Sequence, residues 1–230
     1  MNETVFLALS LIIPLVFAIV FHEVAHGLMA RALGDRTAEE MHRLTLNPLR
    51  HVDPLGTIIL PGMLALLKLP VFGWAKPVPV NKWRLRDPRT GMMLVAAAGP
   101  ASNLILAAIG AVLLGLLARV YGGDQTPTGA VAFVAANLTN FLQINIFLAL
   151  FNLLPLPPFD GSHIVEGLLP VRLARAYGGL RRLGFALFFL LLFVVPLLVP
   201  GFDLVGHYVM PPVQWLINRY MALATIVARQ

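Results

Sequence analysis

The chain contains no cysteine and few charged residues. Without cysteine among its 230 residues it can form neither a disulfide nor a thiolate metal site, so any metal must be held by histidine and carboxylate. Only 12% of the residues are charged and 58% are hydrophobic, with a mean hydropathy of +0.81. A soluble domain of this length could not bury so much apolar surface, and the composition therefore predicts a membrane protein.

Positive charge is missing from the long segment 120–171. Lysine and arginine concentrate instead in 31–89 and 172–182, within a chain of net charge +6. This asymmetry is typical of cytoplasmic loops that follow the positive-inside rule, and it argues against nucleic acid as a partner. We therefore expect both basic segments to face the cytoplasm and the uncharged turn 121–129 to face outward.

Long apolar runs predict four membrane-spanning helices. A further stretch, 213–228, is shorter and carries Arg219, so it fits either a fifth span or an interfacial helix. The predicted fold is an α-helical polytopic membrane protein, with about four to six transmembrane or re-entrant segments in a single domain over 1–230. The N-terminal run has no basic residue before it, so we do not expect a cleaved signal peptide. The four predicted spans lie near 4–33, 90–119, 130–153 and 180–199.

The segment 50–80 fits none of these spans. Its apolar run, 55–71, is interrupted by two prolines, a glycine and a lysine, and the prolines of 73–80 favour extended backbone. We expect a short extended, β-hairpin-like membrane loop near 44–80 that packs over the first span. The alternative is a loop on the membrane surface, anchored by Trp74 and Trp83.

An H-E-x-x-H motif ends the first apolar run. On a helix, His22 and His26 share one face about 6 Å apart along the axis, so both imidazoles can hold one zinc ion. Glu23 lies one step round the helix, where a carboxylate can take a proton from water without being a ligand. Three ionisable groups are costly in lipid and indicate function. The alternative is a chance match at a helix end.

A third zinc ligand is expected from elsewhere in the chain, because catalytic zinc takes three protein ligands. Asp160 is the best candidate, since the prolines before it end the third span and Gly161 allows a tight turn. The carboxylate can then point sideways at the depth of the two histidines. Alternatively, Asp160 caps a helix that begins near Ser162. His163 can also reach inward, although a lone histidine more often has a supporting or structural role.

Together these motifs resemble the site-2 protease family of intramembrane zinc metalloproteases. The resemblance depends on F-H-E-V-A-H at 21–26 and on N-L-L-P-L-P-P-F-D-G at 152–161, and A-G-P-A-S-N at 98–103 is similar to a third family motif. The resemblance implies that His22, His26 and Asp160 bind one zinc, that Glu23 is the catalytic base, and that Asn103 and Asn152 line the site. From the residues alone, an asparagine in a membrane helix is as often a link between helices as a contact to substrate.

The absence of certain motifs and domains narrows the class of membrane protease. The chain has no G-x-x-x-x-G-K-S/T phosphate loop, so an ATP-driven membrane protease is excluded, and it leaves no room for a PDZ or CBS domain. It therefore resembles the compact, core-only class, with a catalytic core over about 4–170 and C-terminal helices over about 178–228.

The function implied by the resemblance is hydrolysis of peptide bonds in or near transmembrane segments of membrane proteins. We expect an integral protein of a prokaryotic cell membrane, in contact with the lipid bilayer, with its site open to the cytoplasm. We also expect the 54–80 segment to add an unwound substrate as a neighbouring strand. Whether the protein acts with a separate adaptor or as a homo-oligomer stays open. The competing hypothesis is a non-catalytic zinc-binding or ion-transporting membrane protein, and the position of Glu23 argues against it.

Overall fold

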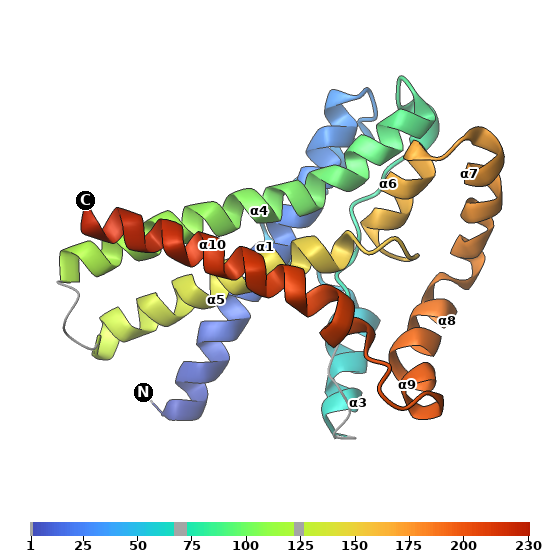
Figure 1. The fold of residues 1–230 in the computed structure, drawn as a ribbon. Helices are drawn as coiled ribbons and strands as arrows, with labels where there is room; N and C mark the ends of the chain where they lie inside the picture. The colour runs from blue at the N-terminus through green and yellow to red at the C-terminus, as the bar shows by residue number, and fades with distance from the viewer. Residues whose placement is uncertain (1, 67–72, 122–126) are drawn as a thin grey trace.

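The computed structural model describes residues 2–66, 73–121 and 127–230. Within those ranges the secondary structure is helical and contains no strand, which confirms the predicted fold class (Figure 1). Short 3₁₀ and π segments connect some of the helices. The helices are α1 (Glu3–Ala32), α2 (Thr37–Glu40), α3 (Leu60–Leu66), α4 (Pro88–Tyr121), α5 (Gly129–Asn152), α6 (Asp160–Leu168), α7 (Val171–Gly178), α8 (Gly184–Phe189), α9 (Val195–Leu198) and α10 (Met210–Arg229).

Four segments of the described chain are long and apolar enough to cross a membrane. They are α1, α4, α5 and the run Val171–Leu198, which includes α7 to α9, and they confirm the four predicted spans. The stretch predicted over 213–228 belongs to α10, which is not among the four and lies along α4 in Figure 1. Much of the predicted outer turn, 122–126, lies outside the described residues.

Small residues allow the long helices to pack closely. Ala107 of α4 and Leu142 of α5 are fully buried in one apolar cluster, to which α10 also contributes. A Cβ atom at Gly115 of α4 would overlap the carbonyl oxygen of Ala224 in α10. Close approach through small side chains is how membrane helices gain packing energy where lipid removes the usual hydrophobic drive. This packing holds α4, α5 and α10 together, and α4 lies directly against α1, which carries much of the site.

The loop after α2 differs from the predicted extended hairpin. Residues 54–66 are helical, as a π segment (Pro54–Ile59) followed by α3, so the predicted strand edge over 54–80 is wrong for this part. The cause is local: the Asp53 carboxylate accepts the N–H groups of Leu55 and Gly56, and Pro54 suits the first helical position. Residues 67–72 lie outside the described part of the chain.

Residues 73–81, which we name the strap, form neither helix nor strand and run as an elongated segment (Figure 1). The strap folds back on the preceding loop without forming a strand pair: the N–H of Lys76 donates to the carbonyl of His51 at 2.8 Å, and the N–H of Trp74 donates to that of Gly56 at 3.1 Å. The ring of Trp74 also lies 5.2 Å from that of Phe185 in α8. Trp74 is therefore packed within the protein and is not a free surface anchor.

The far end of the strap is tied to the end of α1 by a buried carboxylate. Asp35 has no exposed surface, and it accepts the N–H and hydroxyl of Thr37 and the N–H of Asn81, the last at 2.6 Å. Burial raises the pKa of Asp35, but the hydrogen bonds from Thr37 and Asn81 outweigh it and hold that pKa below the ordinary value of 3.8. The charged carboxylate therefore stabilises the fold.

We expect Asp35→Asn to lower the free energy of unfolding by about 1–3 kcal/mol at pH 7, because an amide nitrogen would face backbone donors. The pKa of Asp35 is lower in the folded than in the unfolded chain. Its contribution to the free energy of unfolding is therefore complete above pH 3.8 and is lost as the pH falls through the folded pKa. Thermal unfolding midpoints in detergent, measured between pH 3 and 7, should therefore differ by a constant amount above about pH 5 and converge in acid. A difference that already closes between pH 7 and 5 would contradict this assignment.

Candidate metal centre

Two histidines and one carboxylate converge where α1 meets α6. His22 and His26 lie one turn apart on α1, and Asp160 is the first residue of α6. Asp160 Oδ2 lies 3.1 Å from His22 Nε2 and 3.3 Å from His26 Nε2, and the three side chains are only 9%, 12% and 19% exposed. The structure thus brings together the three residues that the sequence proposed as ligands.

The spacing of these atoms fits a tetrahedral metal ion. Ligands about 2.0 Å from zinc at tetrahedral angles are about 3.3 Å apart, close to the two separations measured from Asp160 Oδ2. One potential ligand atom from each of the three residues lies within 4.8 Å of the others, and Asp160 Oδ2 is buried with no hydrogen-bond partner among the described residues. A donor set of two imidazoles and one carboxylate suits zinc.

The capping alternative for Asp160 does not match the structure. Phe159 occupies the N-cap position of α6 without a side-chain hydrogen bond, and Asp160 already belongs to the helix. Gly161 is needed directly after it, because a Cβ there would overlap the carbonyl oxygens of Leu153 and Leu154. The proline-rich turn and this glycine together direct the carboxylate toward the histidines.

The second nitrogen of each histidine is held by an oxygen. His22 Nδ1 lies 2.5 Å from Asn103 Oδ1, and His26 Nδ1 lies 2.7 Å from the carbonyl oxygen of Val95, both on α4. Carbonyl oxygens can only accept, so each neutral imidazole carries its proton on Nδ1. The lone pair of each Nε2 is thereby left facing Asp160, which is the arrangement that orients histidine ligands in metal proteins.

Asn103 is itself fixed by a buried chain of amides. Its Nδ2 donates to the carbonyl of Ala18 at 3.2 Å and to Asn145 Oδ1 at 2.7 Å, and both asparagines are fully buried. These two donations leave Oδ1 to face His22. Asn145 was missed by the sequence analysis, although a polar residue inside an apolar span could have singled it out. Asn152 instead donates to the carbonyl of Leu148 within its own helix.

Glu23 is held by the strap. Its Oε2 accepts the N–H of Val78 at 2.8 Å, so the strap crosses α1 beside the histidines. The strap is supported from its other side by Arg43, whose guanidinium donates to the carbonyls of Lys76 and Pro77 at 3.0 and 3.4 Å. The carboxylate predicted to act as a base therefore has a fixed place next to the metal group.

Gly99 brings the backbone of α4 against the two imidazoles. A Cβ atom there would lie 2.5 Å from His26 Nε2 and 2.6 Å from His22 Cε1, closer than real Cβ contacts allow. The A-G-P-A-S-N segment at 98–103 therefore contributes both a bare backbone surface and the Asn103 amide.

We expect Gly99→Ala to weaken metal binding although it removes no ligand. The added methyl group must displace one imidazole, because the nearest atoms belong to rings held by hydrogen bonds on their other side. A displacement of this kind should lower metal affinity at least as much as losing an orienting partner, by about 10–100-fold. Gly62→Ala is the matched control, since its Cβ would meet nothing within 4 Å. Equal metal affinities of the two variants would contradict the tight packing described.

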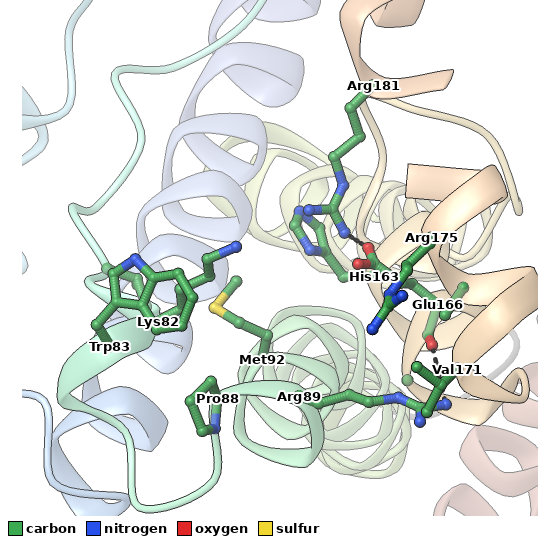
Figure 2. A pocket seen from close by; sticks show the side chains of 13 residues that line it. Lys82, Trp83, Pro88, Arg89, Met92, His163, Glu166, Val171, Arg175 and Arg181 are labelled. Carbon is green, nitrogen blue, oxygen red and sulfur yellow. Dashed lines mark hydrogen bonds and ion pairs between the residues drawn. The ribbon is translucent and has the colours of Figure 1, made fainter. Parts of the chain in front are cut away.

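His163 lies apart from the metal group. It lines a cavity of about 300 Å³ beside α6, together with Glu166, Lys82 and Arg175 (Figure 2). Its Nδ1 is buried without a hydrogen-bond partner in the described part of the chain. Within the described ranges His163 makes no hydrogen bond to the three proposed ligands, although it lies close enough for the charges of Asp160 and His26 to act on its pKa.

The fold and the site define a polytopic helical membrane protein with a His–His–Asp group whose geometry can hold a metal ion. Residues 10–195 match the model of peptidase family M50, the site-2 protease family, and the chain belongs to this family. The resemblance stated from the motifs is thereby confirmed.

Relatives in several bacteria carry the name of zinc metalloproteases. YwhC of Bacillus subtilis is 42% identical over 206 residues, covering 88% of this chain and 84% of its own. Rip2 of Mycolicibacterium smegmatis is 31% identical over 182 residues, or 79% and 64% of the two chains, and Rip2 of Mycobacterium tuberculosis is 31% identical over 210 residues, or 90% and 75%. No solved structure matches the chain. These findings support a zinc metalloprotease of the bacterial membrane.

Proposed function

We propose that this protein hydrolyses peptide bonds in or near transmembrane segments of other membrane proteins. His22, His26 and Asp160 hold one zinc ion, and Glu23 acts as the general base. The observation that carries the proposal is the buried His–His–Asp group with its Nε2 atoms directed at one carboxylate oxygen and Glu23 held beside it. An ion-transporting protein needs no fixed carboxylate at that position.

The chain's own residues divide the chemistry between them. Zinc, when bound, supplies Lewis acidity that polarises a carbonyl and makes water more acidic. Glu23 accepts the proton of the attacking water and returns it to the leaving amine. The N–H of Val78 occupies Oε2 of Glu23 and leaves Oε1 to take that proton. Asn103 and the carbonyl of Val95 keep both imidazoles in the protonation state that ligands require.

The strap is the part of the loop that can receive an unwound substrate. We infer that alternate residues of the strap point their N–H and C=O groups to the same edge, as in extended backbone, so that Val80 faces the edge where Val78 meets Glu23. In the described part of the chain, the N–H of Val80 has no hydrogen-bond partner. We infer that this N–H binds the substrate backbone. The strand addition that the sequence predicted for 54–80 is then made by the strap alone.

We expect Val80→Pro to slow cleavage of an intact membrane substrate about tenfold, because it removes one main-chain donor at the substrate edge. Metal content should not change, since Val80 is not one of the proposed ligands. Val80→Ala is the control, because it shortens the side chain and keeps the N–H. If the proline and alanine variants cleave at the same rate, the strap does not bind the substrate backbone.

The test of the function is cleavage of single-span peptides reconstituted with the purified protein. Chelation of the metal should stop hydrolysis, and zinc should restore it. Orientation is tested by single cysteines at the exposed Leu49, Leu168 and Thr128, labelled with an impermeant reagent on intact cells. Only the Thr128 position should react, which would place the basic segments and the site on the cytoplasmic side. Labelling of Leu49→Cys from outside would overturn that orientation.

A further inference from the structure

A half-open cavity of about 300 Å³ lies beside the metal centre, and we name it the basic cavity. Its walls come from the 3₁₀ turn Lys82–Arg84, the start of α4, α6 and α7. Figure 2 shows Lys82 and Trp83 on one side and His163, Glu166 and Arg175 on the other. Apolar side chains, among them Val80 and Met92, complete the lining.

Positive charge exceeds negative charge in the basic cavity. Four cations, Lys82, Arg89, Arg175 and Arg181, line it together with one carboxylate, that of Glu166. Burial, together with the charge of Arg181, lowers the pKa of His163 to about 4, so this imidazole is neutral at pH 7. Three positive charges are therefore left without a compensating charge in the lining.

The contacts of the cations leave two of them available. The Arg181 guanidinium forms an ion pair with Glu166, and Arg89 donates to the backbone carbonyl of Glu166 at 3.4 Å. Lys82 lies over the Trp83 ring at 4.8 Å. In the described ranges, neither Lys82 nor Arg175 has a carboxylate within ion-pair distance. Both can serve an anion that enters the cavity.

The basic cavity continues the path of the strap away from the metal. Val78 bonds Glu23, and Lys82 follows it by four residues, a distance of about 13 Å in extended backbone. On the other wall, His163 and Glu166 belong to α6, the helix that starts with Asp160. A peptide lying along the strap at the metal therefore reaches the Lys82 end of this cavity about four residues from the reacting bond.

We propose that the basic cavity binds an acidic side chain of the substrate, about four residues from the bond that is cleaved. The inference rests on the proposed proteolytic function and adds a substrate class to it. The arginine and lysine groups recognise the carboxylate, and the apolar walls contact its methylene groups. The continuity with the strap favours a peptide over a lipid headgroup as the occupant.

The experiment compares matched substrates and matched enzymes in vesicles of neutral lipid. Single-span peptides carry Glu or Gln at each position three to five residues from the cleaved bond, on both sides. The enzymes are the wild type, Lys82→Gln, Arg175→Gln and Arg172→Gln. Arg172 is an exposed α7 residue that does not line the cavity, so its variant controls for loss of charge alone.

Replacing the acidic residue at one position should raise KM about five- to tenfold and leave kcat unchanged, as expected for a charge contact made equally in the ground and transition states. Arg175→Gln and Lys82→Gln should each raise KM for the Glu substrate by a similar factor and change KM for the Gln substrate little. Arg175→Glu should prefer a substrate with lysine at that position. A purely structural role of Arg175 would not produce this reversal.

Equal KM values of the wild type for the Glu and Gln substrates would overturn the assignment of the cavity alone. The assignment is also wrong if anionic lipid accelerates the wild type on both substrates and this effect disappears in Arg175→Gln, since the cavity then holds a lipid headgroup. Absence of cleavage of any substrate by the zinc-loaded wild type would overturn the proposed function, and this inference with it.

Discussion

Glu23→Gln is expected to retain the metal and to lose peptide hydrolysis by at least about 100-fold, the lower bound for removing a general base. The glutamine amide has the size of the carboxylate but cannot accept the proton of the attacking water. The three proposed ligands are unchanged, so metal content measured on the same preparation should equal that of the wild type. Loss of hydrolysis without loss of metal distinguishes a general base from a metal ligand.

The control for this experiment is Glu3→Gln, at the exposed start of the same helix. It removes an acidic group from α1 without touching the centre, so neither cleavage nor metal content should change. A Glu23→Gln protein that still turns over, or that loses the metal, would contradict the role of Glu23 as a base.

Asp160→Ala is expected to reduce zinc affinity by more than the 10–100-fold typical of losing an orienting partner, because it removes a ligand itself. Two imidazoles remain, and the buried space between them gains no new donor. Cleavage should fall with metal occupancy at low zinc concentration. Metal titration by competition with a chelating dye would measure both the affinity and the number of sites, for which we expect one per chain.

Asp87→Ala provides the matched control for Asp160→Ala. The Asp87 carboxylate accepts the N–H groups of Arg89 and Thr90 at the start of α4, so its removal destabilises a helix end without touching the metal group. If both variants bind zinc as tightly as the wild type, Asp160 is a structural residue and the ligand assignment is wrong.

The sequence predicted the parts of the site that follow from spacing along one element. The two histidines and Glu23 follow from helical periodicity, and Asp160 from the prolines that end the third span and the glycine that comes directly after it. The four spans were predictable because hydropathy depends on composition and length alone.

The parts that were not predictable depend on contacts between elements. The carbonyl of Val95, which holds His26, has no side-chain signature, and Asn145 acts through Asn103 on a different helix. The same is true of the basic cavity, because Lys82 and Arg175 are distant in sequence and meet only in the folded chain. The helix over 54–66 was missed for a local reason, since the capping signal of Asp53 and Pro54 outweighs the prolines and glycine that follow.

The bond between the strap and Glu23 cannot survive a shift of the strap by a single residue. Val78 lies between Pro77 and Pro79, and neither proline nitrogen carries a hydrogen. A slip of the strap by one residue in either direction would therefore present Glu23 with a nitrogen that cannot donate. The two prolines therefore protect the alignment of the proposed base against the smallest errors of register, those of one residue.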